Sequence, residues 1–178
     1  MTVSGTGDLD SLLQASRDGQ TERVSAILST KPSFINHTDQ GGRTALHWDS
    51  RNGRLDIVQL LLNNGVEINK QDMIGDTALI LASHEGHRDV VHLLLQRGLN
   101  FYICNVDRGG PLHHAAENGN EHIVNFLLER GEEMNKANDN GDTPLYIACQ
   151  EGHEKVVEIL VERGAEVNKA CNGLTPLY

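Results

Sequence analysis

The 178-residue sequence has few aromatic residues, few prolines and no long apolar run. Aromatic side chains make up 4% of the residues, and only 4 prolines and 3 cysteines occur. The longest uninterrupted apolar runs are residues 78–82 and 145–149, whereas a membrane-spanning helix needs about 20 apolar residues. The start of the chain lacks the basic and apolar segments of a secretory signal peptide. These absences disfavour a membrane protein and a secreted protein.

The net charge and the number of cysteines indicate which classes of partner and which cellular compartment to expect. The net charge is −10, which disfavours broad electrostatic binding to nucleic acid or to an anionic membrane. Cys104, Cys149 and Cys171 form no close pair, and an odd number of cysteines without a secretion signal indicates reduced thiols. We therefore expect an intracellular protein, located in the cytoplasm, in the nucleus or in both.

Glycines and leucines recur in this chain with a period of 33 residues. Apolar residues make up 38% of the sequence, enough for one folded domain with a core of Leu, Ile, Val and Ala. Three sets of residues keep the same spacing over four copies, which chance does not produce. They are Gly53, Gly86, Gly119 and Gly152; Gly65, Gly98, Gly131 and Gly164; and Leu46, Leu79, Leu112 and Leu145. A repeat architecture is therefore predicted, in which neighbouring copies bury each other's apolar side chains.

Each copy predicts two short helices after a turn. In the last complete copy, Thr143 is suited to cap the first helix, and Pro144 is suited to its first turn. Gly152 separates the two helices, and Gly164 ends the second helix where a left-handed residue is favoured. The apolar residues of the second helix recur on one helical face, which has to pack against another unit.

This pattern resembles the ankyrin repeat. The copy that matches best carries Gly141, Thr143-Pro144-Leu145, Gly152-His153, Gly164-Ala165 and Val167-Asn168. The resemblance covers about residues 8–178 and implies an all-α ankyrin-repeat solenoid of stacked helix-turn-helix units with β-hairpin-like loops. We expect a disordered tail at 1–7, a degenerate N-terminal capping repeat at 8–38, full repeats at 39–71, 72–104, 105–137 and 138–170, and the start of a truncated repeat at 171–178. Because no second helix follows Tyr178, we expect the native chain to continue.

The sequence predicts no catalytic or metal site. Of the 9 histidines, four occupy the two positions at which ankyrin repeats carry histidine, where the ring is expected to bond neighbouring backbone: His47, His87, His113 and His153. The other histidines share no ligand spacing with a carboxylate or a cysteine. Phosphate-binding glycine loops and nucleophile elbows are also missing. We therefore expect a protein that is not an enzyme and needs no cofactor.

Two departures from the repeat pattern leave alternatives open. Asp49 occupies a packed position that is alanine in the other full copies. It is either a functional acid beside Trp48, or a structural substitution that is partly exposed, paired with an arginine or tolerated as a defect. In both cases we expect it to be the weakest point of the core. In the third copy Gly110 replaces the capping threonine and Arg108 replaces the usual glycine, which indicates either drift or a reshaped loop tip.

Three asparagines occur at one position of the loops between copies: Asn69, Asn135 and Asn168. The ankyrin resemblance implies that such an asparagine caps the hairpin. In the family it can also be a substrate of an intracellular asparaginyl hydroxylase. These three residues are therefore the predicted hydroxylation sites.

The ankyrin resemblance further implies a concave binding face made of loop tips and first helices. The exposed positions of this face are basic in the first full copy and acidic in the next three, with an apolar spot between them. The candidate partner-binding residues are Arg43, Arg51, Met73, Ile74, Asp76, His84, Val106, Asp107, Glu117, Asp139 and Asp142.

The resulting prediction is a monomeric protein-protein interaction scaffold without chemistry of its own. Its partner is expected to be another protein with a basic and apolar epitope, because the face offers acidic and apolar side chains. Nucleic acid is disfavoured by the acidic face, and no membrane partner is expected. The alternative is a regulatory or targeting ankyrin domain of a longer enzyme, channel or receptor.

Overall fold

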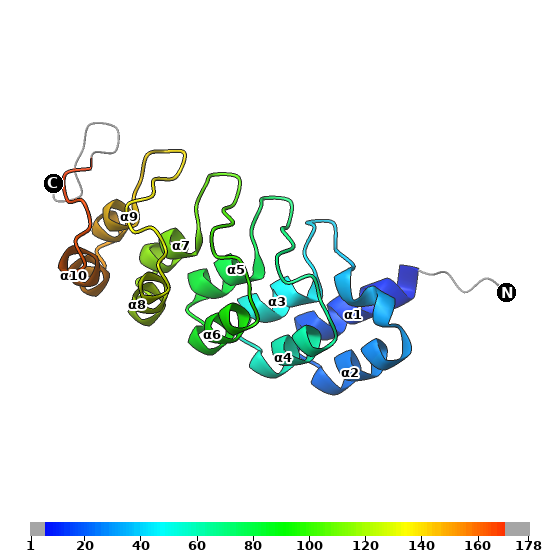
Figure 1. Ribbon diagram of the computed structural model, residues 1–178. Helices are drawn as coiled ribbons and strands as arrows, with labels where there is room; N and C mark the ends of the chain where they lie inside the picture. The colour runs from blue at the N-terminus through cyan, green and yellow to red at the C-terminus, as the bar shows by residue number, and fades with distance from the viewer. Residues whose placement is uncertain (1–5, 170–178) are drawn as a thin grey trace.

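The chain folds into a row of helix pairs stacked side by side (Figure 1). The structure is a computed structural model that describes residues 6–169, with side chains from residue 12 onward. The helices are α1 (Thr6–Asp18), α2 (Thr21–Thr30), α3 (Ala45–Arg51), α4 (Leu55–Asn63), α5 (Ala78–Glu85), α6 (Arg88–Gln96), α7 (Pro111–Glu117), α8 (Glu121–Glu129), α9 (Pro144–Gln150) and α10 (Glu154–Glu162), and the 3-10 helix η1 (Pro32–Asn36) follows α2.

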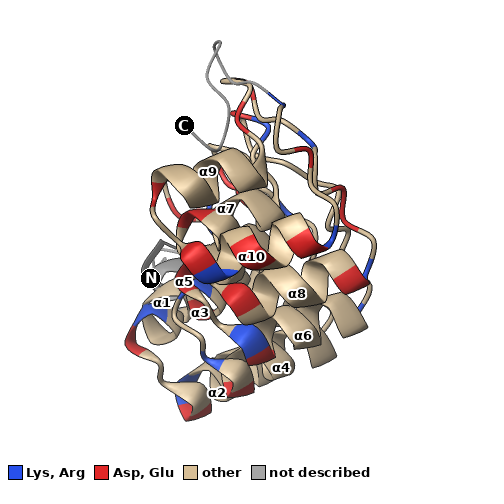
Figure 2. Ribbon diagram, turned by 90° about the vertical axis from the view of Figure 1, so that its left-hand side faces the viewer, with Lys and Arg blue, Asp and Glu red and all other residues tan. Residues whose placement is uncertain are grey.

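The first helix of each pair belongs to one row and the second helix to another, as the view along the stack shows (Figure 2). Within the first row, α3 packs against α5, α5 against α7, and α7 against α9, and these contacts are more extensive than those between second helices. The connecting segments contain turns, and no β-strand occurs within residues 6–169. The expected all-α solenoid is confirmed, with loops that are hairpin-shaped but closed by turns.

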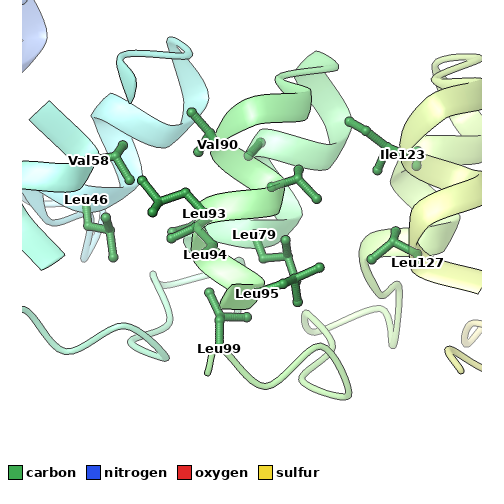
Figure 3. Packing of buried hydrophobic residues seen from close by; sticks show 14 of the residues in the cluster. Leu46, Val58, Leu79, Val90, Leu93, Leu94, Leu95, Leu99, Ile123 and Leu127 are labelled. Atoms are coloured by element: carbon green, nitrogen blue, oxygen red, sulfur yellow. The ribbon is translucent and has the colours of Figure 1, made fainter. Parts of the chain in front are cut away.

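Small residues on the first helices allow the copies to approach closely. Ala82, Ala115 and Ala148 are fully buried. The periodic leucines at 46, 79, 112 and 145 are also buried, because each lies between two copies. The second helices contribute one apolar face each, and Figure 3 shows Val58 and Ile123 on either side of the α6 residues. The core therefore runs the whole length of the stack.

In the four full copies, the residue before the second helix binds the preceding copy. The four residues at this position are Arg54, His87, Asn120 and His153. Nε2 of His87 lies 2.9 Å from the carbonyl oxygen of Arg51, and the side chain of Asn120 donates to the carbonyl oxygen of Ser83 at 2.8 Å. Because a carbonyl only accepts, the imidazole donates its N–H. These bonds occupy carbonyl oxygens near the C-terminal ends of the preceding first helices.

Threonine caps the first helices of the second and fourth copies. Oγ1 of Thr77 accepts a hydrogen bond from the N–H of Ile80 at 3.3 Å, and Oγ1 of Thr143 accepts from the N–H of Tyr146 at 3.2 Å. Each bond satisfies a backbone donor that has no partner inside the helix. The sequence prediction for these caps is confirmed.

In the third copy, a glutamate from a different loop replaces the missing cap. Oε1 of Glu132 accepts a hydrogen bond from the N–H of Leu112 at 3.2 Å. A β-carbon at residue 110 would lie 3.3 Å from this oxygen, so Gly110 leaves the room that the carboxylate needs. Burial raises the pKa of Glu132 to about 7. We therefore expect the loss of threonine at residue 110 and the presence of Glu132 to be coupled.

Asp49 lies fully buried on α3. Its Oδ1 is 3.4 Å from Nη1 of Arg54, and its Oδ2 has no partner among the described residues. The Arg54 guanidinium donates to the carbonyl oxygens of Ser16 and Arg17, so it is shared with α1. Burial raises the pKa of Asp49 to about 7. Partial exposure is therefore the wrong alternative, and a side chain without solvent access cannot touch a partner.

The copy boundaries at residues 39, 72, 105 and 138 all fall in loops. Helix α1 begins at Thr6, within the segment predicted as a tail, and α1 with α2 forms the unit predicted as a cap. The rest of that tail, residues 1–5, and the predicted truncated repeat at 171–178 lie outside the described residues.

Replacing Asp49 by alanine is expected to stabilise the protein at pH 7. A pKa of about 7 in the folded chain, against 3.8 unfolded, means that the folded state binds more protons between these values. The contribution of Asp49 to the stability of the natural chain therefore falls as the pH rises from 4 to 7. The expected gain at pH 7 is about 1–4 kcal/mol, since one pKa unit corresponds to about 1.4 kcal/mol. Urea unfolding at pH 7 and at pH 4 measures it.

The control for this variant is Asp89→Ala, which removes an exposed carboxylate from α6. It is expected to lower the stability by less than about 1 kcal/mol, through the lost interaction with the helix N-terminus. The gain from Asp49→Ala should shrink towards pH 4, because Asp49 is then protonated in the folded state. A gain that is equal at both pH values would show that the carboxylate is not the cause.

A double-mutant cycle tests the coupling between Gly110 and Glu132. Gly110→Thr crowds the Glu132 carboxylate, and Glu132→Ala removes the acceptor of the Leu112 N–H. The double variant restores a threonine cap with a small residue opposite it. It is expected to be more stable than the sum of the single variants by about 1–2 kcal/mol. Additive effects in urea unfolding would mean that the two positions are independent.

Candidate functional site

Backbone hydrogen bonds join the tips of successive loops. They run from the N–H of Met73 to the carbonyl of Gly41, from Val106 to Ile74 and from Asp139 to Asp107, each at 2.9 Å. Gly75 has a φ of +82°, and a β-carbon there would lie 2.9 Å from the backbone nitrogen of Val106. The tips form a continuous platform, and we call this platform with the exposed sides of α3, α5, α7 and α9 the loop face (Figure 1).

The apolar spot predicted on this face is exposed. The side chains of Met73, Ile74 and Val106 keep 74%, 49% and 61% of their surface accessible. They lie on neighbouring tips that are joined by the bond between Val106 and Ile74. Asp107, the next residue, is exposed as well. Three apolar side chains with this exposure on a rigid platform are suited to anchor a partner.

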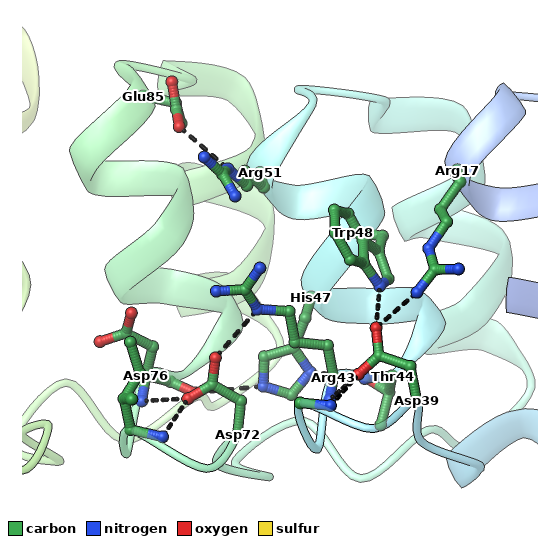
Figure 4. A network of polar contacts seen from close by, with 12 residues as sticks. Arg17, Asp39, Arg43, Thr44, His47, Trp48, Arg51, Asp72, Asp76 and Glu85 are labelled. Carbon is green, nitrogen blue, oxygen red and sulfur yellow. Dashed lines mark hydrogen bonds and ion pairs between the residues drawn. The ribbon is translucent and has the colours of Figure 1, made fainter.

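The basic end of the loop face is neutralised within the chain. Nε of Arg43 lies 3.1 Å from Oδ2 of Asp72, and Nε of Arg51 lies 3.1 Å from Oε1 of Glu85 (Figure 4). Both acids belong to the next copy, so the pairs also link the two copies. The predicted change from a basic to an acidic face is therefore wrong in its first half, because the positive charge is paired.

A polar cluster around Trp48 closes the N-terminal end of the loop face (Figure 4). The indole N–H donates to Oδ2 of Asp39 at 3.0 Å, and Arg17 donates to the same oxygen at 2.6 Å. The guanidinium groups of Arg17 and Arg43 lie 4.7 Å and 5.3 Å from the Trp48 ring centre. Sequence reasoning missed this cluster, although an arginine near the chain's single tryptophan was a visible signal.

Asp76 lies deeper than its variable position in the repeat suggested. It is only 8% exposed, and its Oδ1 has no partner among the described residues. Its backbone N–H donates to Oδ1 of Asp72 at 2.9 Å, and its carbonyl oxygen lies 3.2 Å from Nε2 of His47. Burial is the main reason why its pKa is raised. The prediction of a fully exposed contact residue is wrong for Asp76.

The centre of the loop face carries two histidines beside carboxylates. Nδ1 of His84 lies 3.6 Å from Oε1 of Glu85, and Nδ1 of His114 lies 3.2 Å from Oε2 of Glu117. The two imidazole rings have centres 6.0 Å apart. His114 was not among the sequence candidates, because only the stacking of the second and third copies brings it to His84.

The C-terminal part of the loop face is acidic and hollowed. Asp107, Glu117 and Asp142 line a cavity of about 240 Å³ between the third and fourth copies. Nε of Arg108 lies 3.1 Å from Oδ1 of Asp139, and Arg108 has a φ of +56° where the other copies carry glycine. The loop tip is therefore reshaped around an interloop ion pair. The structure brings these predicted residues to one surface.

The histidines at the motif positions have structural roles. Nδ1 of His47 accepts the N–H of Thr44 at 3.1 Å, and burial lowers the pKa of the ring. Nδ1 of His113 accepts the N–H of Gly110 at 3.2 Å, and burial lowers its pKa to about 4. Both rings are neutral at pH 7 and hold the start of a first helix.

Among residues 12–169, no group of three His, Cys, Asp or Glu side chains is placed to hold a metal ion.

Two of the three asparagines between copies, Asn69 and Asn135, act as caps, as expected. Oδ1 of Asn69 accepts the N–H of Asn100, and Oδ1 of Asn135 accepts the N–H of Glu166, both at 2.9 Å. Each bond connects one loop to the loop of the following copy. Asn168 is exposed. Hydroxylation of the three asparagines stays a prediction.

A second depression lies away from the loop face. It has a volume of about 780 Å³, lies between α4 and α6, and is lined by Leu55, Gln59, His92 and Leu93 among others. None of the predicted site residues lines this depression.

None of the helices formed by the described residues is both long and apolar enough to cross a membrane.

The family pattern described as "Ankyrin repeats (3 copies)" matches residues 12–105 and 98–171. These two ranges include nearly every described residue, and all four full copies and most of the cap lie within them.

Curated relatives match the chain over short segments only. Palmitoyltransferase akr1 of Schizosaccharomyces pombe is 35% identical over 60 residues, which is 34% of this chain and 9% of that protein. NAD-capped RNA hydrolase NUDT12 of Homo sapiens is 42% identical over 50 residues, which is 28% of this chain and 11% of the relative. Probable E3 ubiquitin-protein ligase XBOS32 of Oryza sativa subsp. japonica is 40% identical over 58 residues, which is 32% of this chain and 12% of that protein. The chain thus spans about a tenth of the length of these relatives.

Proposed function

Because the chain belongs to the ankyrin repeat family, whose repeats are protein-protein interaction modules, we propose that it binds a protein partner through the loop face. The observation that carries this proposal is the apolar spot of Met73, Ile74 and Val106 on adjoining loop tips. Because backbone hydrogen bonds join these loop tips, little backbone freedom is lost on binding, and the cost of ordering is confined to the side chains. They are therefore suited to be the anchors of the interface.

The proposed partner presents an apolar residue flanked by basic ones. Arg43, Arg51 and Arg108 of the loop face are each engaged by an acid of the neighbouring copy. Acids next to the apolar spot, such as Asp107, remain exposed. Complementary charges around an apolar anchor speed association and select the partner, whereas the apolar contact provides most of the affinity.

The proposed role is binding, without a chemical step carried out by this chain. The alternative is that the repeats regulate or target a longer protein, and the relatives give it limited support. Their names include a transferase, a hydrolase and a ligase, each matched over about a tenth of its length. We propose that the chain acts as a monomer, since the described loop face is complete within one copy of the chain.

The variant Met73→Ser/Ile74→Ser is expected to weaken partner binding by about 2–4 kcal/mol, the usual size of losses at the centre of an interface. This corresponds to about 30- to 1,000-fold in Kd. The partner is first isolated by affinity capture on the natural chain. Both proteins are then titrated with the purified partner.

The matched control is Leu55→Ser/Val161→Ser, which removes two exposed apolar side chains from the second helices. It should leave the affinity unchanged. Melting curves should be nearly the same for all three proteins, because surface substitutions seldom alter stability much. An unchanged affinity of the Met73 and Ile74 variant would move the binding site away from these tips.

A further inference from the structure

The apolar spot on the loop face contains one atom that a mild oxidant can change, the thioether sulfur of Met73. Met73 keeps 74% of its surface accessible, the largest value among the exposed large hydrophobic residues of the described chain. Ile74 and Val106 offer only aliphatic groups, which hydroperoxides do not attack under mild conditions. The chemistry of the spot therefore depends on a single sulfur atom.

The tip that carries Met73 is held by its backbone. The N–H of Met73 donates to the carbonyl oxygen of Gly41 at 2.9 Å, and the N–H of Ile74 donates to Oδ1 of Asp72 at 3.0 Å. A β-carbon at Gly42 would lie 3.2 Å from Cγ of Met73, so the side chain starts alongside the preceding tip. The Met73 side chain is not part of the buried core. A chemical change at its sulfur therefore alters the surface and leaves the tip in place.

The other sulfur atoms of residues 12–169 are less accessible. Met134 is partly buried and packs against the core, as does Cys149. Cys104 is partly buried as well, and the ammonium group of Lys136 lies 3.0 Å from its sulfur. Met73 is therefore the most exposed sulfur-containing residue in this part of the chain, and Met134 provides a control of the same residue type.

We propose that Met73 is an oxidation site, where a hydroperoxide converts the side chain to methionine sulfoxide and thereby weakens binding of the protein partner. The inference rests on the proposed function and adds a form of regulation to the same site. The substrate class is a small hydroperoxide, such as hydrogen peroxide, which reaches the sulfur from solvent. Methionine sulfoxide is reduced again by methionine sulfoxide reductases, so the change is reversible.

The step is the transfer of one oxygen atom. A lone pair of the Met73 sulfur attacks one oxygen of the hydroperoxide, an S–O bond forms and the O–O bond breaks. The sulfur loses two electrons, and the hydroperoxide is reduced. The other peroxide oxygen leaves with the electron pair of the broken bond, receives the proton of the transferred oxygen through solvent water, and departs as water or an alcohol. No residue of the chain has to act as an acid or a base, but the sulfur must be open to water and peroxide, which the exposure of Met73 provides.

The product of this reaction is unsuited to be an apolar anchor. A sulfoxide is strongly polar, and its oxygen accepts hydrogen bonds from water that are lost when the surface is buried. Beside the spot, Asp107 is an exposed acid that offers no donor when ionised, and the guanidinium group of Arg43 is engaged by Asp72. The cost of desolvating the sulfoxide is therefore not offset by this chain, and the affinity for the partner falls.

The first test measures the modification on the free chain, independently of any partner. The natural chain is treated with hydrogen peroxide at pH 7, and digestion followed by mass spectrometry measures the sulfoxide at each methionine. Met73 is expected to be oxidised at least about fivefold faster than Met134, because only an accessible sulfur meets the oxidant. After unfolding in urea, the two rates should become similar. Equal rates in the folded chain, or a difference that persists in urea, would overturn the proposal.

The second test measures binding of the captured partner. The peroxide is removed before the partner is added, and a thiol reductant restores any oxidised cysteine while the sulfoxide remains. Oxidation is expected to weaken binding to the natural chain at least about tenfold, and a methionine sulfoxide reductase should restore it. Met73→Leu should bind like the natural chain and keep its affinity after peroxide, because leucine retains the apolar contact without a sulfur. Met134→Leu, the matched control, should lose affinity on oxidation as the natural chain does.

The outcomes separate this inference from the proposed function. An affinity that is unchanged by oxidation, when Met73→Ser/Ile74→Ser binds weakly, would overturn the oxidation switch alone. If neither oxidation nor that variant weakens binding, both proposals fail. A loss of affinity that also occurs in Met73→Leu would place the oxidised group elsewhere and contradict the inference. The oxidised chain should melt at the temperature of the untreated chain, since a lower value would mean that oxidation acts through unfolding.

Discussion

The structure depends on one constraint, that no repeat can bury its apolar face without the next. The alanines at 82, 115 and 148 bring the first helices together, and the periodic leucines fill the space between copies. In the four full copies, the residue before the second helix then binds the carbonyls of the preceding copy, as His87 and Asn120 do. The loop tips are also joined by backbone hydrogen bonds, so that packing and hydrogen bonding hold successive copies in the same alignment. The loop face is a consequence of this alignment.

Local features of the fold could be predicted from the sequence, whereas pairings between copies could not. The sequence predicted the helix start at Thr143, and helix α9 begins at Pro144. It also identified Met73 and Ile74 as exposed tips, because the repeat period fixes which positions face solvent. The charge of Arg43 was misjudged, since its partner Asp72 comes from the next loop and a period alone does not show which side chains meet. Asp76 was misplaced for a related reason, because residues of the neighbouring copies lie against it, such as His47 at its carbonyl oxygen.

Each departure from the repeat pattern lies beside a second residue that is more distant along the chain. Gly110 appears in the sequence as the loss of a cap, yet Glu132 provides an acceptor for the same helix end. Asp49 appears as an isolated defect, yet it lies beside Arg54, the residue that binds α1. The two cases differ in outcome. Glu132 makes a backbone hydrogen bond that the helix needs, whereas one oxygen of Asp49 has no partner among the described residues. The contact of Glu132 with Leu112 and that of Asp49 with Arg54 each lie within one copy, so the repeat pattern of the other copies does not depend on them.

We propose that binding takes place on the loop face and not on the row of second helices. Hydrogen exchange of the chain with and without its captured partner tests this most directly, because the backbone of both surfaces is monitored in one measurement. Amides of the tips at 73–76 and 106–109 and of helices α5 and α7 are predicted to exchange more slowly in the complex. Those of α4 and α6, around the depression near Leu55 and Leu93, should be unchanged. Protection confined to α4 and α6, with the tips unaffected, would contradict binding at the loop face.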